Sequence, residues 1–353
     1  YFKEALGMEN IGAYYVVAYF IVLIALFNFH KLIKKYGKSY VFFASFAIKL
    51  FSLAFLITMP PSLIGAIFLV VHMIFGTLEV VALDIILESF SVDKMSGRVR
   101  GIYLTLLNTG FILGPLLSTN ALENFGFKGV FIISLFINIF ILLVSFIGLS
   151  GINHKLNKRL TVAELLKKIW QRPNVKRIYC VSFILESFYA VMIIFMPIYL
   201  RDLGMSWQQI GVVFTLMLLP FLFLTYPVGW LADKKFGEKE MIFLALLIIG
   251  GGTFLIYFIN SAAILPWIII LFITRIGAAA LQALRDSYFY KRIDGRDVDL
   301  IDFFRTAMPA AYIFSMIGAT IILIFFPLKI IFIFLTALII VGLYPTYKLV
   351  DNL

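Results

Sequence analysis

Long apolar runs alternate with short polar segments along almost the whole chain. A helix needs about 20 predominantly apolar residues to cross the hydrocarbon core of a bilayer, and the runs reach that length. A helix also satisfies its own backbone groups, as the bilayer interior requires. The pattern therefore predicts an all-α membrane protein with eleven helices, at about 11–31, 40–58, 63–88, 101–123, 128–149, 176–200, 208–232, 240–259, 264–290, 300–325 and 328–348.

The pattern also repeats. YFKEALGMENIG begins at Tyr1, and YLRDLGMSWQQIG begins at Tyr199. In both places an apolar run follows and ends in a basic turn with a glycine, HKLIKKYGKS from His30 and GWLADKKFGEKE from Gly229. The offset of about 200 residues is far longer than a solenoid period. Duplicated halves of this kind are typical of secondary transporters, whose binding site lies between the repeats.

The repeat predicts two pseudo-symmetric bundles, an N-terminal half at 1–149 and a C-terminal half at 177–353. The second half has a helix at 176–200 ahead of its YLRDLGM segment, whereas the first half has none, and the chain begins with Tyr rather than Met. We therefore expect a parent of twelve helices in two sets of six, of which eleven are present.

A polar connector at 150–176 joins the halves. Thr161 and Glu164 form a capping-box pattern there, and apolar residues follow at helical spacing. This predicts a short amphipathic helix that ends before Pro173. A linker helix on the lipid surface and a regulatory helix both fit the pattern.

Composition agrees with a membrane protein, because 62% of the residues are hydrophobic, only 14% are charged, and the mean hydropathy is +1.02. The net charge of +11 does not indicate nucleic acid, since it follows the loops. Of the 30 Lys and Arg residues, 22 lie in alternate loops on one side and 4 lie on the other. By the positive-inside rule, the basic loops and the C-terminus are cytoplasmic, in a multi-pass protein of the plasma or inner membrane.

Enzyme and pump motifs are absent. The sequence has no G-x-x-x-x-G-K-[ST] and no H-E-x-x-H, and no Ser/His/Asp arrangement is recognisable. One cysteine, Cys180, and three histidines give no metal-ligand spacing. We therefore predict neither a cofactor nor a metal. The hypothesis of a membrane-embedded enzyme would be restored only if the protein formed a product in detergent.

Two segments resemble motifs of the major facilitator superfamily. PVGWLADKKFGEKE resembles the signature loop after the second helix of a half, with one extra residue. The matching positions are Gly229, Leu231, Ala232, Asp233, Lys234, Gly237 and Lys239. NTGFILGP resembles the antiporter motif at Gly110, Gly114 and Pro115, with Ser118 and Thr119 in place of its final glycine pair. Small residues there let a neighbouring helix approach closely, and ordinary helix packing explains them equally well.

The resemblance implies the twelve-helix fold, a monomer, and a gate at the signature loop. In the family the loop aspartate latches the cytoplasmic side, so Asp233 is the candidate here, with Gly229, Lys234 and Gly237 around it. The expected partners in the other half are Arg98 and Arg100. The first-half copy of the loop keeps only its basic residues and glycine, and has no aspartate.

Ionisable groups within membrane spans cost roughly 2.5–3.5 kcal/mol each on insertion scales, so each indicates a function or a partner. Glu186 lies near the middle of helix 176–200, and Tyr189 shares its face. We expect Glu186 to bind a proton or the substrate. The alternative is a structural ion pair with Arg275 or Lys49.

Arg275, Gln282 and Asp286 lie at spacings of seven and four, so they form one stripe on helix 264–290. Such a stripe is expected to face a cavity. Arg275 is predicted to bind an anionic group on the substrate or to hold Glu186 in its deprotonated state. Arg285, nearer the cytoplasmic end, is expected to snorkel to the interface.

Helix 63–88 carries His72, Glu79 and Asp84. His72 and Glu79 are seven residues apart and share a helix face. They are therefore expected to form either a proton relay or a hydrogen-bonded pair with a structural role only. Asp84 lies closer to the cytoplasm. Lys49 has no role in this interpretation.

The sequence thus predicts a secondary transporter that moves a small organic solute by alternating access, with protons as the coupling ion and export as the preferred direction. A proton symporter or uniporter that imports a nutrient remains an alternative, as does a transport-inactive sensor on the same fold. Membrane lipids are the other expected partner. Flux against an imposed gradient separates import from export, and ligand binding without flux indicates a sensor.

Overall fold

The computed structural model describes residues 1–7, 11–90, 96–149, 168–232, 234, 237–293 and 298–350. These residues form helices and short turns, and no strand occurs among them. They divide into two compact units. The first contains Tyr1–Leu107 and Ser118–Lys158, and the second contains Asn108–Leu117 and Arg159–Leu353.

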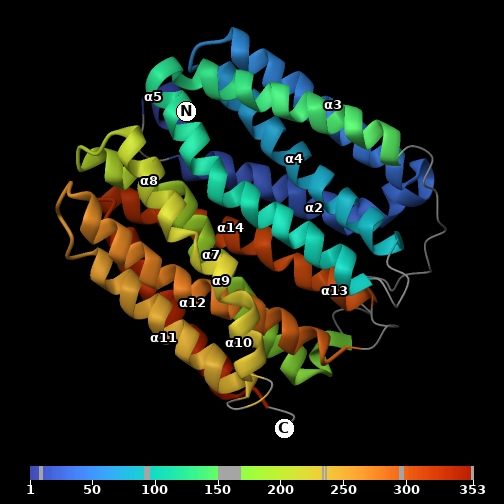
Figure 1. Ribbon diagram of the computed structural model, residues 1–353, viewed down its shortest axis with the longest axis vertical. Coiled ribbons are helices and arrows are strands. Elements are labelled where there is room, and N and C mark those ends of the chain that lie inside the picture. Colours follow the sequence, from blue (N-terminus) through green and yellow to red (C-terminus); the bar gives the residue numbers. More distant parts are fainter. Residues whose placement is uncertain are drawn as a thin grey trace. The chain divides into compact units, whose positions relative to one another are not determined.

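The first unit is built around α4. Its helices are α1 (Phe2–Leu6), α2 (Gly12–Tyr36), α3 (Lys38–Thr58), α4 (Leu63–Phe90) and most of α5 (Ser96–Leu149). α3 packs along α4, which also contacts α1 and α2 (Figure 1). The last part of α5 lies along α3, where Ser39 donates a hydrogen bond to the carbonyl oxygen of Leu149 at 2.8 Å and Phe43 contacts Phe146.

α5 is two membrane helices in succession. Its apolar part, Leu106–Leu149, has 44 residues. At 1.5 Å per residue it would extend about 66 Å, twice the ~30 Å hydrocarbon core. Gly126 interrupts it with φ 62° and ψ −165°, a conformation that a side chain would oppose. This break agrees with the two helices predicted at 101–123 and 128–149, and with it the ten apolar spans found among the described residues provide eleven crossings.

The second unit surrounds α7 (Pro173–Asp202), the span with the largest buried share. α14 (Ala307–Phe325), α15 (Ile330–Tyr347) and α12 (Ile264–Tyr290) all pack against it. α11 (Glu238–Ile256) packs along α12 (Figure 1) and also contacts α15. Phe188 and Phe195 of α7 are fully buried in this core.

Two helices predicted as continuous are broken. The span predicted at 208–232 consists of α8 (Trp207–Met217), α9 (Pro220–Phe223) and α10 (Thr225–Leu231). Pro220 has no N–H to donate, so the helical ladder is interrupted before it. The span predicted at 300–325 consists of α13 (Val298–Arg305) and α14, which meet at Thr306.

The duplicated turns have matching backbones. Gly7 and Gly204, at the same place in the two LGM sequences, have φ of 62° and 94°. Gly37 and Gly237 precede α3 and α11 with φ/ψ of 90°/155° and 78°/159°. Because residues with a side chain rarely adopt these values, the repeat in the sequence is also a repeat of local structure.

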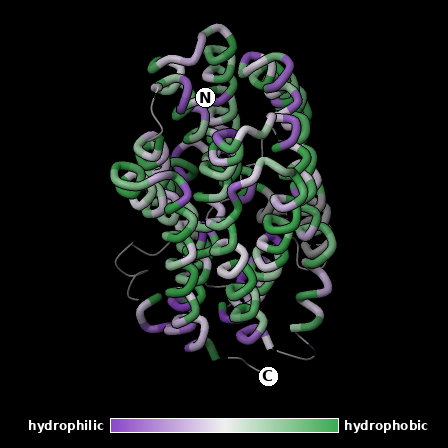
Figure 2. Tube along the Cα trace, turned by 90° about the vertical axis from the view of Figure 1, so that its left-hand side faces the viewer, coloured by the Kyte–Doolittle hydropathy of each residue, from purple (hydrophilic) through white to green (hydrophobic). Residues whose placement is uncertain are grey.

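Apolar side chains cover the outside of both units. Large hydrophobic residues such as Phe111, Ile147, Phe223 and Phe325 are exposed along the helices. Figure 2 shows hydrophobic colour along most helix lengths, with hydrophilic colour gathered toward the helix ends. A soluble protein would not expose so much apolar surface, whereas lipid tails match it. The linker prediction at Thr161 and Glu164 lies outside the described residues.

A glycine lets α11 and α12 approach closely. A Cβ atom at Gly277 would lie 2.7 Å from the carbonyl oxygen of Ala245 and 2.8 Å from Ile249 Cγ1. We predict that Gly277→Ala lowers the free energy of unfolding by about 1–3 kcal/mol, because the backbone of α11 must move. Thermal unfolding of the purified protein in detergent measures this.

Gly251→Ala is the matched control, because a Cβ at Gly251 would have no atom within 4 Å. We expect this variant to be as stable as the original, or slightly more so, since alanine favours helix. Equal loss of stability in both variants would contradict the packing argument.

Candidate functional site

A cavity of about 390 Å3 lies in the second unit. This volume is within the range of small-molecule sites. α7, the broken helix α8–α9, α12 and the segment Asn108–Pro115 of α5, which belongs to this unit, all line it. Its lining residues are Asn108, Gly110, Phe111, Ile112, Gly114, Pro115, Tyr189, Met192, Ile193, Phe214, Met217, Leu218, Phe221, Arg275 and Gln282.

Arg275 places a positive charge in the wall of this cavity. Only 2% of the residue is exposed, and its Nε and Nη1 atoms have no hydrogen-bond partner in the described chain. The guanidinium instead lies over the rings of Phe188, at 4.9 Å, and Tyr189, at 5.8 Å. Aromatic faces attract a cation, but they leave its N–H donors unused. The arrangement can therefore accept an anionic or strongly polar group.

Tyr189 and Gln282 join α7 to α12 beside Arg275. The Tyr189 hydroxyl donates a hydrogen bond to Gln282 Oε1 at 2.9 Å. Both residues line the cavity, together with Arg275. The structure thus brings together three of the residues predicted to bind substrate.

Glu186 is paired with Arg285, not with Arg275 as the sequence suggested. Arg285 Nη1 lies 2.7 Å from Glu186 Oε1 and also donates to Ser182 Oγ at 2.9 Å. Arg285 Nε lies 3.3 Å from Asp286. The sequence predicted that Arg285 snorkels to the membrane interface. This prediction is wrong, because only 12% of the Arg285 side chain is exposed. The pair cross-links α7 and α12 in the interior of the unit.

A second buried pair lies in the first unit. Lys49 and Glu79 form an ion pair between α3 and α4, and 11% of each side chain is exposed. This gives Lys49 the partner that the sequence did not identify. His72 Nδ1 lies 3.3 Å from the carbonyl oxygen of Lys49. This is the only hydrogen bond found for His72 in the described chain, and its partner is the backbone rather than Glu79. Asp84 lies further along α4 and is partly buried.

The small-residue motif on α5 borders the cavity. Gly110, Gly114 and Pro115 all line it. A Cβ at Gly110 or Gly114 would have no atom within 4 Å. The close helix approach suggested by the sequence is therefore not seen at these positions among the described residues.

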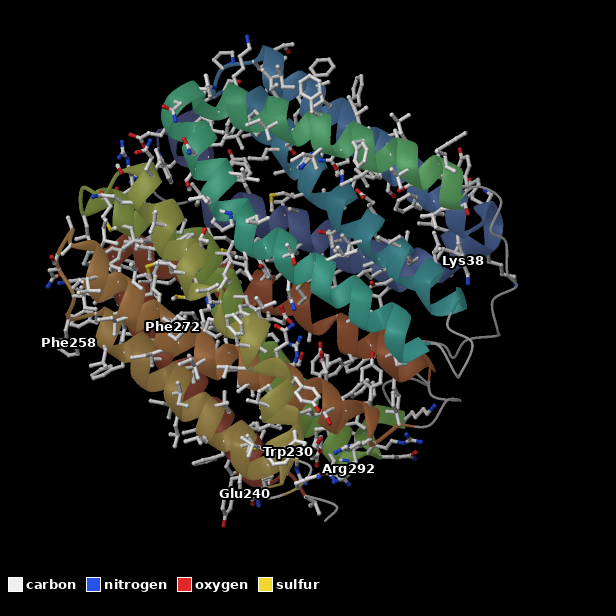
Figure 3. The ribbon with its side chains drawn as sticks, viewed as in Figure 1. Lys38, Trp230, Glu240, Phe258, Phe272 and Arg292 are labelled. Atoms are coloured by element: carbon white, nitrogen blue, oxygen red, sulfur yellow. The ribbon has the colours of Figure 1, made fainter. Side chains whose placement is uncertain are left out.

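The predicted gate is only partly described. Asp233 lies outside the described residues, and Arg98 and Arg100 are in α5 but their side chains are not described. Gly229 lies in α10, Gly237 caps α11, and Lys234 Nζ lies 5.4 Å from the centre of the Trp230 ring. Figure 3 shows Trp230, Glu240 and Arg292 at one end of the second unit, and Phe258 far from them.

Glu238 is a buried carboxylate at this end that sequence reasoning missed. The residue is 8% exposed, accepts a hydrogen bond from Ser287 Oγ, and lies 3.0 Å from Lys291 Nζ. These contacts tie the start of α11 to the end of α12. The signal in the sequence was an acidic residue directly after the turn glycine, opposite the basic loop at Lys291.

Comparison with known proteins decides the family. The model of the Major Facilitator Superfamily matches residues 1–297 and 178–350. The chain belongs to the major facilitator superfamily. A solved structure described as a bacterial homologue of the iron transporter ferroportin, in its inward-facing state, is similar with a TM-score of 0.70 and 13% identity, covering 96% of this chain and 89% of that one. No curated protein matches the chain significantly.

Membership of the superfamily makes the chain a multi-pass membrane transporter rather than an enzyme. At 13% identity, the similarity to the ferroportin homologue shows the fold alone. Within the described residues, no group of three or more His, Cys, Asp or Glu side chains could hold a metal ion.

The Glu186–Arg285 pair yields a stability prediction. Arg285→Gln leaves the Glu186 carboxylate buried without its partner, which costs about 3–5 kcal/mol. Asp286→Asn is the control, because 45% of the Asp286 side chain is exposed and such pairs contribute at most ~1 kcal/mol. Unfolding in detergent should show a large loss for the first and a small loss for the second.

The double variant Glu186→Gln/Arg285→Gln completes a mutant cycle. If the two side chains interact as the structure shows, it is more stable than Arg285→Gln alone. Additive losses would contradict the pairing.

Proposed function

We propose that this transporter carries a small organic solute with an anionic group, by alternating access and with protons as the coupling ion. The observation that supports it best is Arg275, a buried cation in a cavity wall whose Nε and Nη1 donors have no partner in the described chain. A carboxylate or phosphate on the solute would satisfy both donors in a fork-shaped contact.

The remaining wall of the cavity favours an apolar body on that solute. Met192, Ile193, Phe214, Met217 and Phe221 line it. Tyr189 and Gln282 supply a few polar atoms beside the cation. The best-fitting solute is therefore an organic anion with an aliphatic or aromatic part, rather than a strongly hydrated inorganic ion.

Glu186 is the proposed proton site. Its carboxylate forms an ion pair with Arg285 in this structure. Protonation would remove the ion pair and free α7 to shift against α12. A bound organic anion and the Glu186 carboxylate would carry like charges within the same unit, and this repulsion is absent when the anion binds together with a proton. Positive coupling of this kind means that solute and proton move together, as in a symporter.

Export is the second candidate. It is favoured by Gly110, Gly114 and Pro115, which resemble the antiporter motif and line the cavity. In an exporter, the proton and the solute would compete rather than bind together. Imposed pH gradients in both directions distinguish the two functions, because a symporter moves the solute with the proton and an antiporter moves it against the proton.

We likewise propose that Asp233 and Glu238 act at the gate.

We predict that Arg275→Gln weakens binding of acidic solutes about 10- to 100-fold, because a charge-assisted hydrogen bond is lost. The measurement is a thermal-shift screen with compounds offered as pairs, each carboxylic acid beside its amide. The original protein should prefer acids, and the variant should not. Arg201→Gln is the matched control, since Arg201 lies exposed at the far end of α7. An unchanged preference for acids in Arg275→Gln would contradict the proposed site.

We predict that Glu186→Gln uncouples transport from protons. A neutral side chain cannot exchange a proton, so the solute found in the screen should equilibrate across proteoliposomes but not accumulate against a gradient. A pH-sensitive dye inside the vesicles and labelled solute measure both fluxes. Full accumulation by Glu186→Gln would show that Glu186 is not the coupling site and would make Glu79 the next candidate. Binding without any flux in the original protein would indicate a sensor.

A further inference from the structure

A groove separate from the cavity lies between the beginning of α7 and the end of α15. Its volume is about 970 Å3 and it is open on one side. Its lining residues are Trp170, Pro173, Lys176, Arg177, Tyr179, Cys180, Phe183, Ile184, Leu338, Val341, Tyr344, Pro345 and Lys348. It belongs entirely to the second unit, at the end where the basic loops begin.

The groove has a basic mouth. Lys176 and Lys348 are exposed and Arg177 is half-buried. Lys176 Nζ lies 3.9 Å from the centre of the Trp170 ring, and Lys348 Nζ lies 5.4 Å from that of Tyr344. No ion pair of these three side chains with a carboxylate occurs in the part of the chain that the structure describes. Three positive charges therefore converge on the same opening.

Below the mouth the groove is apolar. Phe183 and Ile184 line it from α7, and Leu338 and Val341 line it from α15. At 1.5 Å per residue these positions lie about 10–15 Å along the helices from the basic residues. The helices close the floor of the groove, because a Cβ at Gly342 would overlap the Ile184 side chain. Trp170 and Tyr344, 75% and 68% exposed, lie at the mouth, as aromatic residues do at a membrane interface.

We propose that this groove binds one anionic phospholipid, with its phosphate at Lys176, Arg177 and Lys348 and an acyl chain along Phe183, Ile184, Leu338 and Val341. The charge at the mouth requires an anion, and the long apolar trough requires a hydrocarbon chain attached to it. A basic pocket between membrane helices is a known form of lipid headgroup site. A soluble anion would leave the trough unused.

The test compares phosphatidylglycerol with phosphatidylcholine of the same acyl chains, added to purified, delipidated protein and counted as bound adducts by native mass spectrometry. We expect one tightly held phosphatidylglycerol and no equivalent phosphatidylcholine. The triple variant Lys176→Gln/Arg177→Gln/Lys348→Gln should bind phosphatidylglycerol about 100-fold more weakly, since each basic side chain near anionic lipid contributes roughly fivefold.

The matched control is Lys31→Gln/Lys34→Gln/Lys35→Gln, which removes three exposed charges from the end of α2, in the first unit. It should keep the tightly held lipid. A second variant, Val341→Trp, fills the trough without changing charge and should also weaken phosphatidylglycerol. Equal retention of both lipids, equal loss in the α2 control, unchanged binding by Val341→Trp, or displacement of the lipid by inorganic phosphate would each overturn the proposal.

Discussion

A charge inside the hydrocarbon layer has to be compensated by its nearest neighbours, because neither water nor salt reaches it. This constraint explains the polar contacts of both units. Glu186 is neutralised by Arg285 within the second unit, and Lys49 by Glu79 within the first. Each of these two charges thus has its partner within its own unit. Arg275 differs from these pairs, since its guanidinium lies over two ring faces and its Nε and Nη1 atoms have no hydrogen-bond partner in the described chain.

The helices could be predicted from the sequence because the bilayer makes the signal strong. A span must be long, apolar and internally hydrogen-bonded, and these demands leave little choice. Predicted helices 40–58 and 264–290 correspond closely to α3 and α12. The repeated glycine turns could also be predicted from the sequence, and the glycines of these turns have positive φ in both halves.

Side-chain partners could not be predicted in the same way. Arg275 and Arg285 are ten residues apart on α12, so they point in different directions, and the axial position of α7 decides which one meets Glu186. Helix breaks were equally hidden. Pro115 lies inside α5 without interrupting it, whereas Pro220 separates α8 from α9, and both are prolines in apolar runs. Membrane helices tolerate proline when neighbours satisfy the freed carbonyl groups, and a sequence does not show those neighbours.

The rings around Arg275 have a consequence for the kinetics of a carrier. In the symporter proposed above, the empty carrier must reorient after it releases its cargo, and an uncompensated cation in the cavity wall would raise the barrier to that step. Phe188 and Tyr189 offset part of the charge by a weak attraction that a carboxylate easily replaces. The same two rings thereby compensate part of the positive charge while the cavity is empty, and they leave the Nε and Nη1 donors of Arg275 available to an anionic group.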